Sequence, residues 1–121
     1  MNLRIAALIF GIAFLGAGVV WHMPFLFSDG MLFGLFNIDS MHNKVHIASG
    51  LIALAATYSA YLSRLYFRVF GTFYTILGVL GFFFETQFLG MDINQADNLL
   101  HVVIGAIALF IGFNLKMPKK E

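Results

Sequence analysis

The chain has 121 residues, a formal net charge of +1 and no cysteine, which excludes a basic nucleic-acid-binding surface, disulfides and thiolate metal ligands. Apolar residues make up 60% of it and charged residues 11%, whereas a soluble domain has roughly 25% charged residues. Since the mean hydropathy is +0.88, we expect one integral membrane domain over residues 1–121, with the lipid bilayer as its solvent.

The first expected element is a membrane-spanning helix from Ile5 to Met23. This apolar run follows Arg4 and matches the roughly 20 residues that a helix needs to cross the hydrocarbon core. A basic start and small residues are also typical of a signal peptide, but the run outlasts a usual signal core, so we expect it to be retained. Pro24 ends the helix.

The next segment, FLFSDGMLFGLFNIDS, is too apolar for a loop exposed to water. We expect it to lie in the membrane interface as a short helix or a folded lid. Asp39 or Ser40 can then cap a second helix, which the pattern predicts from about Met41 to Leu62.

Two further helices complete the predicted bundle. A turn containing Arg64 and Arg68 precedes a third apolar span, Val69 to Leu89. After a short polar loop, Asn94 can cap a fourth helix from Gln95 to Leu115. One side of this arrangement carries most of the Lys and Arg residues, and the other carries only Lys44. The residues on the first side are Arg4, Arg64, Arg68, Lys116, Lys119 and Lys120. Both termini and the middle turn are therefore predicted to be cytoplasmic.

The sequence also repeats itself. Residues 36–54, FNIDSMHNKVHIASGLIAL, return 55 positions later as MDINQADNLLHVVIGAIAL. We therefore predict an all-α fold, a four-helix transmembrane bundle built from two tandem helical hairpins, at about 1–63 and 64–121, related by an approximate two-fold axis. An ungapped alignment through Gly18 and Gly81 would place His22 opposite Glu85.

The same residues carry a resemblance to a known family. A Gly-rich apolar lid, HNKVH followed by Gly50, and DNLLH followed by Gly105 resemble a bacterial family of small four-helix membrane proteins of unknown function. The resemblance covers nearly the whole chain and implies a multi-pass protein of the bacterial inner membrane. It implies no activity. The matching residues are His42, Asn43, His46, Gly50, Asp97, Asn98, His101 and Gly105.

Polar residues in the repeat predict a site near the outer face. Residues four apart share a face of a helix, which puts His42, His46 and Gly50 on one stripe, and Asp97, His101 and Gly105 on its copy. The small glycines allow close helix packing, so both stripes are expected to face the bundle interior. Three imidazoles and a carboxylate would suit zinc, iron, copper or manganese.

Three more residues are candidates for this predicted site. Asn43 and Asn98 are placed to support the histidine ligands as hydrogen-bonding partners. Glu85 lies about one turn from the outer end of the third helix, and an ionisable residue inside a span is a functional candidate by default, here as fifth ligand or proton acceptor.

Other interpretations of the pattern stay open. His46 and His101 can ligate haem b as an axial pair, or the polar residues can form a structural network in a non-enzymatic accessory or sensor bundle. Asp97 occupies a capping-box position, which favours a structural role for its carboxylate. The sequence has no nucleophile motif, phosphate loop or dinucleotide fingerprint, so it decides neither enzymatic activity nor membership of a homo-oligomer or larger membrane complex.

Overall fold

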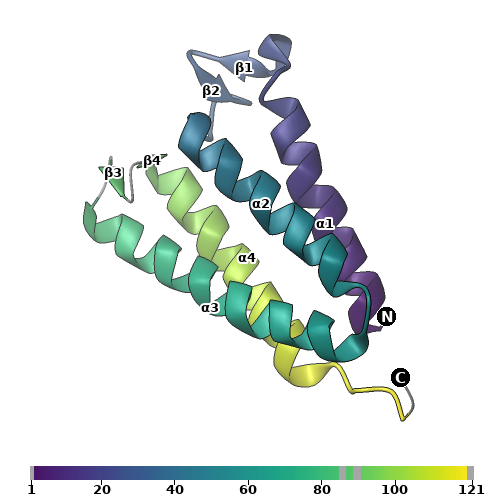
Figure 1. Cartoon of the computed structure of the whole chain (residues 1–121). Helices are drawn as coiled ribbons and strands as arrows, with labels where there is room; N and C mark the ends of the chain where they lie inside the picture. Colours follow the sequence, from purple (N-terminus) through teal and green to yellow (C-terminus); the bar gives the residue numbers. More distant parts are fainter. Residues whose placement is uncertain (1, 85–86, 89–90, 120–121) are drawn as a thin grey trace.

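The structure is a computed structural model that describes residues 2–84, 87–88 and 91–119. Helices dominate these residues, as predicted (Figure 1). The α-helices are α1 (Leu3–Val20), α2 (Ser40–Ala56), α3 (Ala60–Phe84) and α4 (Gln95–Asn114). The shorter elements are a 3₁₀ turn η1 (Pro24–Leu26) and the strands β1 (Phe27–Ser28), β2 (Met31–Leu32), β3 (Gln87–Phe88) and β4 (Met91–Asp92).

Three of the helices, α1, α3 and α4, are long enough and apolar enough to cross a membrane. Large apolar side chains such as Ile12, Phe83 and Phe110 project from their outer faces, with exposed fractions of 60%, 77% and 64%. In a bilayer these faces meet lipid instead of water, so their exposure is favourable. These features indicate a multi-pass membrane protein.

The predicted boundary between the second and third helices is wrong. The second helix ends at Ala56 instead of Leu62, and α3 begins at Ala60 instead of Val69, so the predicted turn is helical. Ser59 caps the new start, because its Oγ accepts a hydrogen bond of 3.0 Å from the Leu62 amide.

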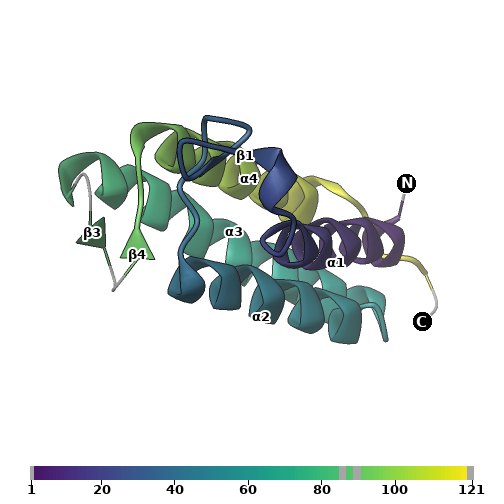
Figure 2. The same cartoon turned by 90° about the horizontal axis from the view of Figure 1, so that it is seen from above.

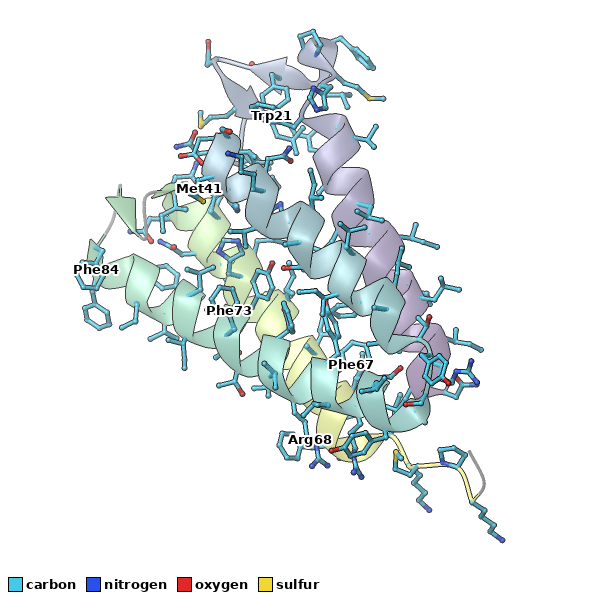
Figure 3. All side chains as sticks on the ribbon, in the orientation of Figure 1. Trp21, Met41, Phe67, Arg68, Phe73 and Phe84 are labelled. Atoms are coloured by element: carbon cyan, nitrogen blue, oxygen red, sulfur yellow. The ribbon has the colours of Figure 1, made fainter. Side chains whose placement is uncertain are left out.

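The contacts of Arg68 explain why a charged residue lies inside α3 instead of in the predicted turn. Its Nε donates to the Gly112 carbonyl at 2.9 Å, and its guanidinium lies 4.3 Å from the centroid of the Phe113 ring. A helical position is therefore compatible with the charge, because the guanidinium is held against α4 near the C-terminal end of the bundle (Figure 3).

Both predicted N-caps are present. Asp39 accepts a hydrogen bond of 2.8 Å from the His42 amide at the start of α2. The Asn94 side chain accepts one of 2.9 Å from the Asp97 amide at the start of α4. The Asp97 carboxylate in turn accepts a hydrogen bond from the Asn94 amide. The second pair is a complete capping box, which satisfies two amides that the helix itself leaves without partners.

The segment between α1 and α2, residues 24–38, is folded, and we call it the lid. A folded lid is one of the two forms that the sequence predicted. Strands β1 and β2 pair antiparallel around a tight turn in which Asp29 and Gly30 both have positive φ, at 54° and 76°. This is the backbone geometry that short hairpin turns favour. Leu32 from the lid is buried.

The chain forms two helical hairpins, because α1 packs mainly on α2 and α3 mainly on α4. The N and C termini lie at one end of the bundle, and the β3–β4 hairpin lies at the other (Figures 1 and 2). Arg4 fastens the terminal end, since its Nε donates to the Thr57 carbonyl in the turn between α2 and α3 at 2.7 Å.

Each hairpin closes through a pair of glycines. A Cβ atom added to Gly50 would lie 3.0 Å from the carbonyl oxygen of Gly11, and one added to Gly105 would lie 2.9 Å from that of Gly71. The glycines of the two histidine stripes therefore lie at close helix contacts. The packing occurs within each hairpin, with Gly50 against α1 and Gly105 against α3.

These contacts define a symmetry that differs from the alignment through Gly18 and Gly81. Gly18 packs on Ile47, and Gly78 packs in the same way on Val102, the residue 55 positions after Ile47. The first helices of the two hairpins therefore correspond at a spacing of 60 positions, and Gly18 matches Gly78. His22 then corresponds to Phe82. Glu85 lies outside the described residues.

We predict that Gly50→Leu destabilises the bundle by about 1–3 kcal/mol, since added side-chain volume must separate α1 from α2. The free energy of unfolding in detergent measures this effect. Gly16→Leu is the matched control, because a Cβ at Gly16 meets nothing within 4 Å. Equal stability of the two variants would contradict the close packing at Gly50.

Candidate metal centre

Three imidazoles meet between the two hairpins. His42 and His46 lie one turn apart on α2, and His101 comes from α4. One ligand atom from each lies within 4.8 Å of the others, and the exposed fractions of the three side chains are 2%, 5% and 0%. The structure therefore brings together the three predicted histidines at one buried point that can hold a metal ion.

The orientation of His42 is set by the lid. Its Nδ1 lies 3.0 Å from the backbone carbonyl oxygen of Asn37. Because a carbonyl oxygen only accepts hydrogen bonds, Nδ1 carries the proton and the Nε2 of the neutral ring presents a lone pair. That Nε2 lies 3.2 Å from the Nε2 of His101.

Three other ring nitrogens are buried without a hydrogen-bond partner among the described residues. They are both nitrogens of His46 and Nδ1 of His101. Buried polar groups are almost always hydrogen-bonded, and an exception calls for an explanation such as a bound ion. The donor set therefore fits a cation that prefers nitrogen ligands.

Aromatic rings pack against two of the imidazoles. The ring of Phe14 lies 5.6 Å from that of His46, and the ring of Tyr74 lies 5.5 Å from that of His101, measured between centroids. Phe14 and Tyr74 also stack on each other at 5.3 Å and correspond at the same 60-position spacing. The centre thus lies between the two copies of the repeat.

Asp97 does not join the group of ligand atoms. Its carboxylate accepts hydrogen bonds from the amides of Asn37, at 3.1 and 3.2 Å, and of Asn94, at 2.9 Å. The side chain is 1% exposed. These two amides occupy the oxygens that the sequence assigned to a metal, because Asp97 stands at the third position of α4 and faces its N-terminus.

Asn43 and Asn98 were predicted to bond the imidazoles, but the described hydrogen bonds include none between them. The Nδ2 of Asn98 donates to Gln95 at 3.2 Å, and the Oδ1 atoms of both asparagines are buried with no partner in the part of the chain that the structure describes. Asn98 packs against Gly81 of α3, and Asn43 lies near Gly18 of α1. Both therefore pack within their own hairpins. Glu85 is outside the described residues.

Sequence reasoning missed the contributions of Asn37, Ser49 and Tyr74. The Oγ of Ser49 lies 2.6 Å from the Tyr74 hydroxyl and donates to the Val45 carbonyl at 2.8 Å. Tyr66 also donates to the Ser49 carbonyl, at 3.0 Å. This network joins α2 to α3 beside the imidazoles. Ser49 lies three residues after His46 on the same face, a signal that the sequence did contain.

The comparisons with known proteins place the chain in a family. Residues 4–114 match the model of a family described as a domain of unknown function, DUF4383. The chain belongs to this family, which confirms a resemblance to a family of unknown function over nearly its whole length. No curated protein and no solved structure matches the chain.

We predict that Tyr74→Phe lowers the free energy of unfolding by about 0.5–1.5 kcal/mol, the usual contribution of one hydrogen bond. Ser49 keeps the Val45 carbonyl as its partner, so no larger penalty is expected. Denaturation in detergent measures the change, and Tyr58→Phe, at an 82% exposed position, serves as the control. A Tyr74→Phe variant as stable as the control would contradict a stabilising role for this network.

Proposed function

We propose that this member of the DUF4383 family is a membrane metalloprotein that binds one transition-metal ion through His42, His46 and His101. The observation that carries the proposal is their convergence within 4.8 Å, together with three ring nitrogens of His46 and His101 that have no hydrogen-bond partner among the described residues. Each imidazole comes from a helix, so the backbone holds the three donors before any ion arrives.

The donors limit the choice of ion. Neutral imidazoles suit zinc, copper and iron, and manganese accepts them when oxygen ligands complete its shell, whereas magnesium and calcium prefer oxygen donors. Three protein ligands leave a position for water or substrate, the arrangement of catalytic zinc sites. Such an ion would support hydrolysis or redox work on a lipid-borne substrate. Glu85 remains our proposed fifth ligand or proton acceptor.

A haem held by His46 and His101 is less well supported than a single ion. The ring centroids of these two residues are 6.1 Å apart, and the ring of His42 completes a triangle beside them, 4.4 Å from His46 and 5.1 Å from His101. A porphyrin between the two rings would have to displace His42 together with its bond to Asn37. One compact ion uses all three imidazoles without such a displacement.

A purely structural polar network, as in an accessory or sensor bundle, is also less well supported. The residues that hold the bundle, such as Ser49 and Tyr74, have hydrogen-bond partners. His46 has no hydrogen-bond partner on either ring nitrogen within residues 2–84, 87–88 and 91–119, although its side chain is buried. In a network that served only stability, nothing would offset the unfavourable free energy of burying these nitrogens.

We predict that protein purified in mild detergent holds stoichiometric metal that is lost in His46→Ala plus His101→Ala, since one remaining imidazole cannot retain the ion. Elemental analysis combined with an absorption spectrum measures both the ion and any haem. His22→Ala is the matched control, because His22 is exposed and outside the cluster.

Three results would contradict this assignment. Metal that survives the double substitution would place the site elsewhere, and absence of metal after loading with zinc, copper, iron and manganese would favour the structural network. A Soret band that disappears with His46→Ala or His101→Ala would favour haem.

We also propose that both termini face the cytoplasm of a bacterial inner membrane. The basic side chains of Arg4 and Arg68 lie at the end of the bundle that carries both termini, and Trp21 lies at the opposite end, near the lid (Figures 1 and 3). Lys and Arg accumulate on the cytoplasmic side of membrane proteins, and Trp favours the interface. The histidine cluster would then lie nearer the outer face.

We predict that Ser28→Cys in the lid reacts with a membrane-impermeant maleimide in intact cells, whereas Tyr58→Cys between α2 and α3 reacts only after lysis. The chain has no native cysteine, so each variant carries a single reporter and the unmodified chain is the blank. Labelling in the reverse pattern would contradict the proposed orientation.

A further inference from the structure

We infer that Asp97 is a positioning residue for the metal centre, which it serves by holding the Asn37 backbone that orients His42. This inference rests on the proposed function. It assigns Asp97 a role different from the direct ligation that its place opposite His42 in the repeat suggests.

Asn37 is fixed from both sides. Its amide donates to both carboxylate oxygens of Asp97, at 3.2 and 3.1 Å, and its carbonyl accepts from Nδ1 of His42 at 3.0 Å. Asp97 belongs to α4 and His42 to α2, so the Asn37 backbone connects the two hairpins. Movement of this backbone would release the imidazole.

The connection selects the form of His42 that a metal requires. The bond to the Asn37 carbonyl selects the tautomer that carries its proton on Nδ1. The lone pair of Nε2 then points toward the cluster. Ligand histidines in proteins normally donate their other ring N–H to a carbonyl or carboxylate, and loss of that support typically costs about 10–100-fold in metal affinity. Here the carbonyl of Asn37 is the direct partner of His42, and the carboxylate of Asp97 holds the amide of the same residue.

The position of Asp97 in the repeat explains how this role arose. Asp39 and Asn94 correspond as the N-caps of α2 and α4, and His42 and Asp97 correspond as the third residues after them. Both third residues reach back to Asn37, His42 to its carbonyl and Asp97 to its amide. The repeat therefore supplies one ligand and one support from equivalent positions.

The test compares Co²⁺ affinity in detergent-solubilised protein, followed by the visible d–d bands of the bound ion. We expect Asp97→Ala to weaken binding by about 10-fold or more, with the same three-histidine spectrum at saturation. Ser59→Ala is the control, because it removes the cap of α3 in the turn between α2 and α3, away from the lid. It should lower thermal stability while leaving Co²⁺ affinity within about twofold.

A double-substitution cycle separates positioning from ligation and from general destabilisation. If Asp97 acts through His42, then Asp97→Ala has no further effect on Co²⁺ affinity in a His42→Ala background. Asn37→Ala keeps both backbone groups and should bind Co²⁺ as the wild type does. It also keeps the test valid if Asp97→Ala fails to fold, because a large loss in Asn37→Ala would overturn a role for the backbone.

The remaining outcomes are distinct. No Co²⁺ binding by the wild type would overturn the proposed function and this inference with it. Wild-type binding with equal affinity in Asp97→Ala would overturn the inference alone. A changed spectrum at saturation, or an additive loss in the His42→Ala background, would instead identify Asp97 as a direct ligand.

Discussion

The burial of His42, His46 and His101 at one point is the constraint on which the rest of the structure depends. Inside a bilayer no water is available to satisfy polar groups, so each must find a partner within the protein. The lid supplies one for Nδ1 of His42, and the rings of Phe14 and Tyr74 pack against His46 and His101. The nitrogens of His46 have no such partner in the described part of the chain, and a metal ion is the partner that we propose for them, since they converge with the other two imidazoles.

Duplication explains how so short a chain builds this centre. Each hairpin contributes a glycine-closed helix pair and an aromatic ring, Phe14 in the first and Tyr74 in the second. The copies meet where His46 and His101 correspond, so a site forms between them that neither hairpin has alone. The symmetry is broken at one pair of positions, where His42 contacts the Asn37 carbonyl and is our proposed ligand, and Asp97 binds the Asn37 amide.

The sequence allowed prediction of whatever depends on local rules. The caps Asp39 and Asn94 and the spacing of His42 and His46 follow from contacts between residues three or four apart, and the structure has them. It did not allow prediction of partners from distant segments. Whether the carboxylate of Asp97 faces an ion or an amide depends on where the lid folds, and the helical position of Arg68 depends on a carbonyl in α4.

The same geometry relates metal binding to assembly of the two hairpins. Helices pack more extensively within each hairpin than between hairpins, so the seam between them is the weaker interface. Two of the histidines belong to one side of that seam and one to the other. An ion bound by all three can bind only the assembled form, so its binding free energy adds to the association of the hairpins. The Asn37 backbone spans the same seam at the lid, and closing the lid and joining the hairpins therefore favour the same arrangement of His42.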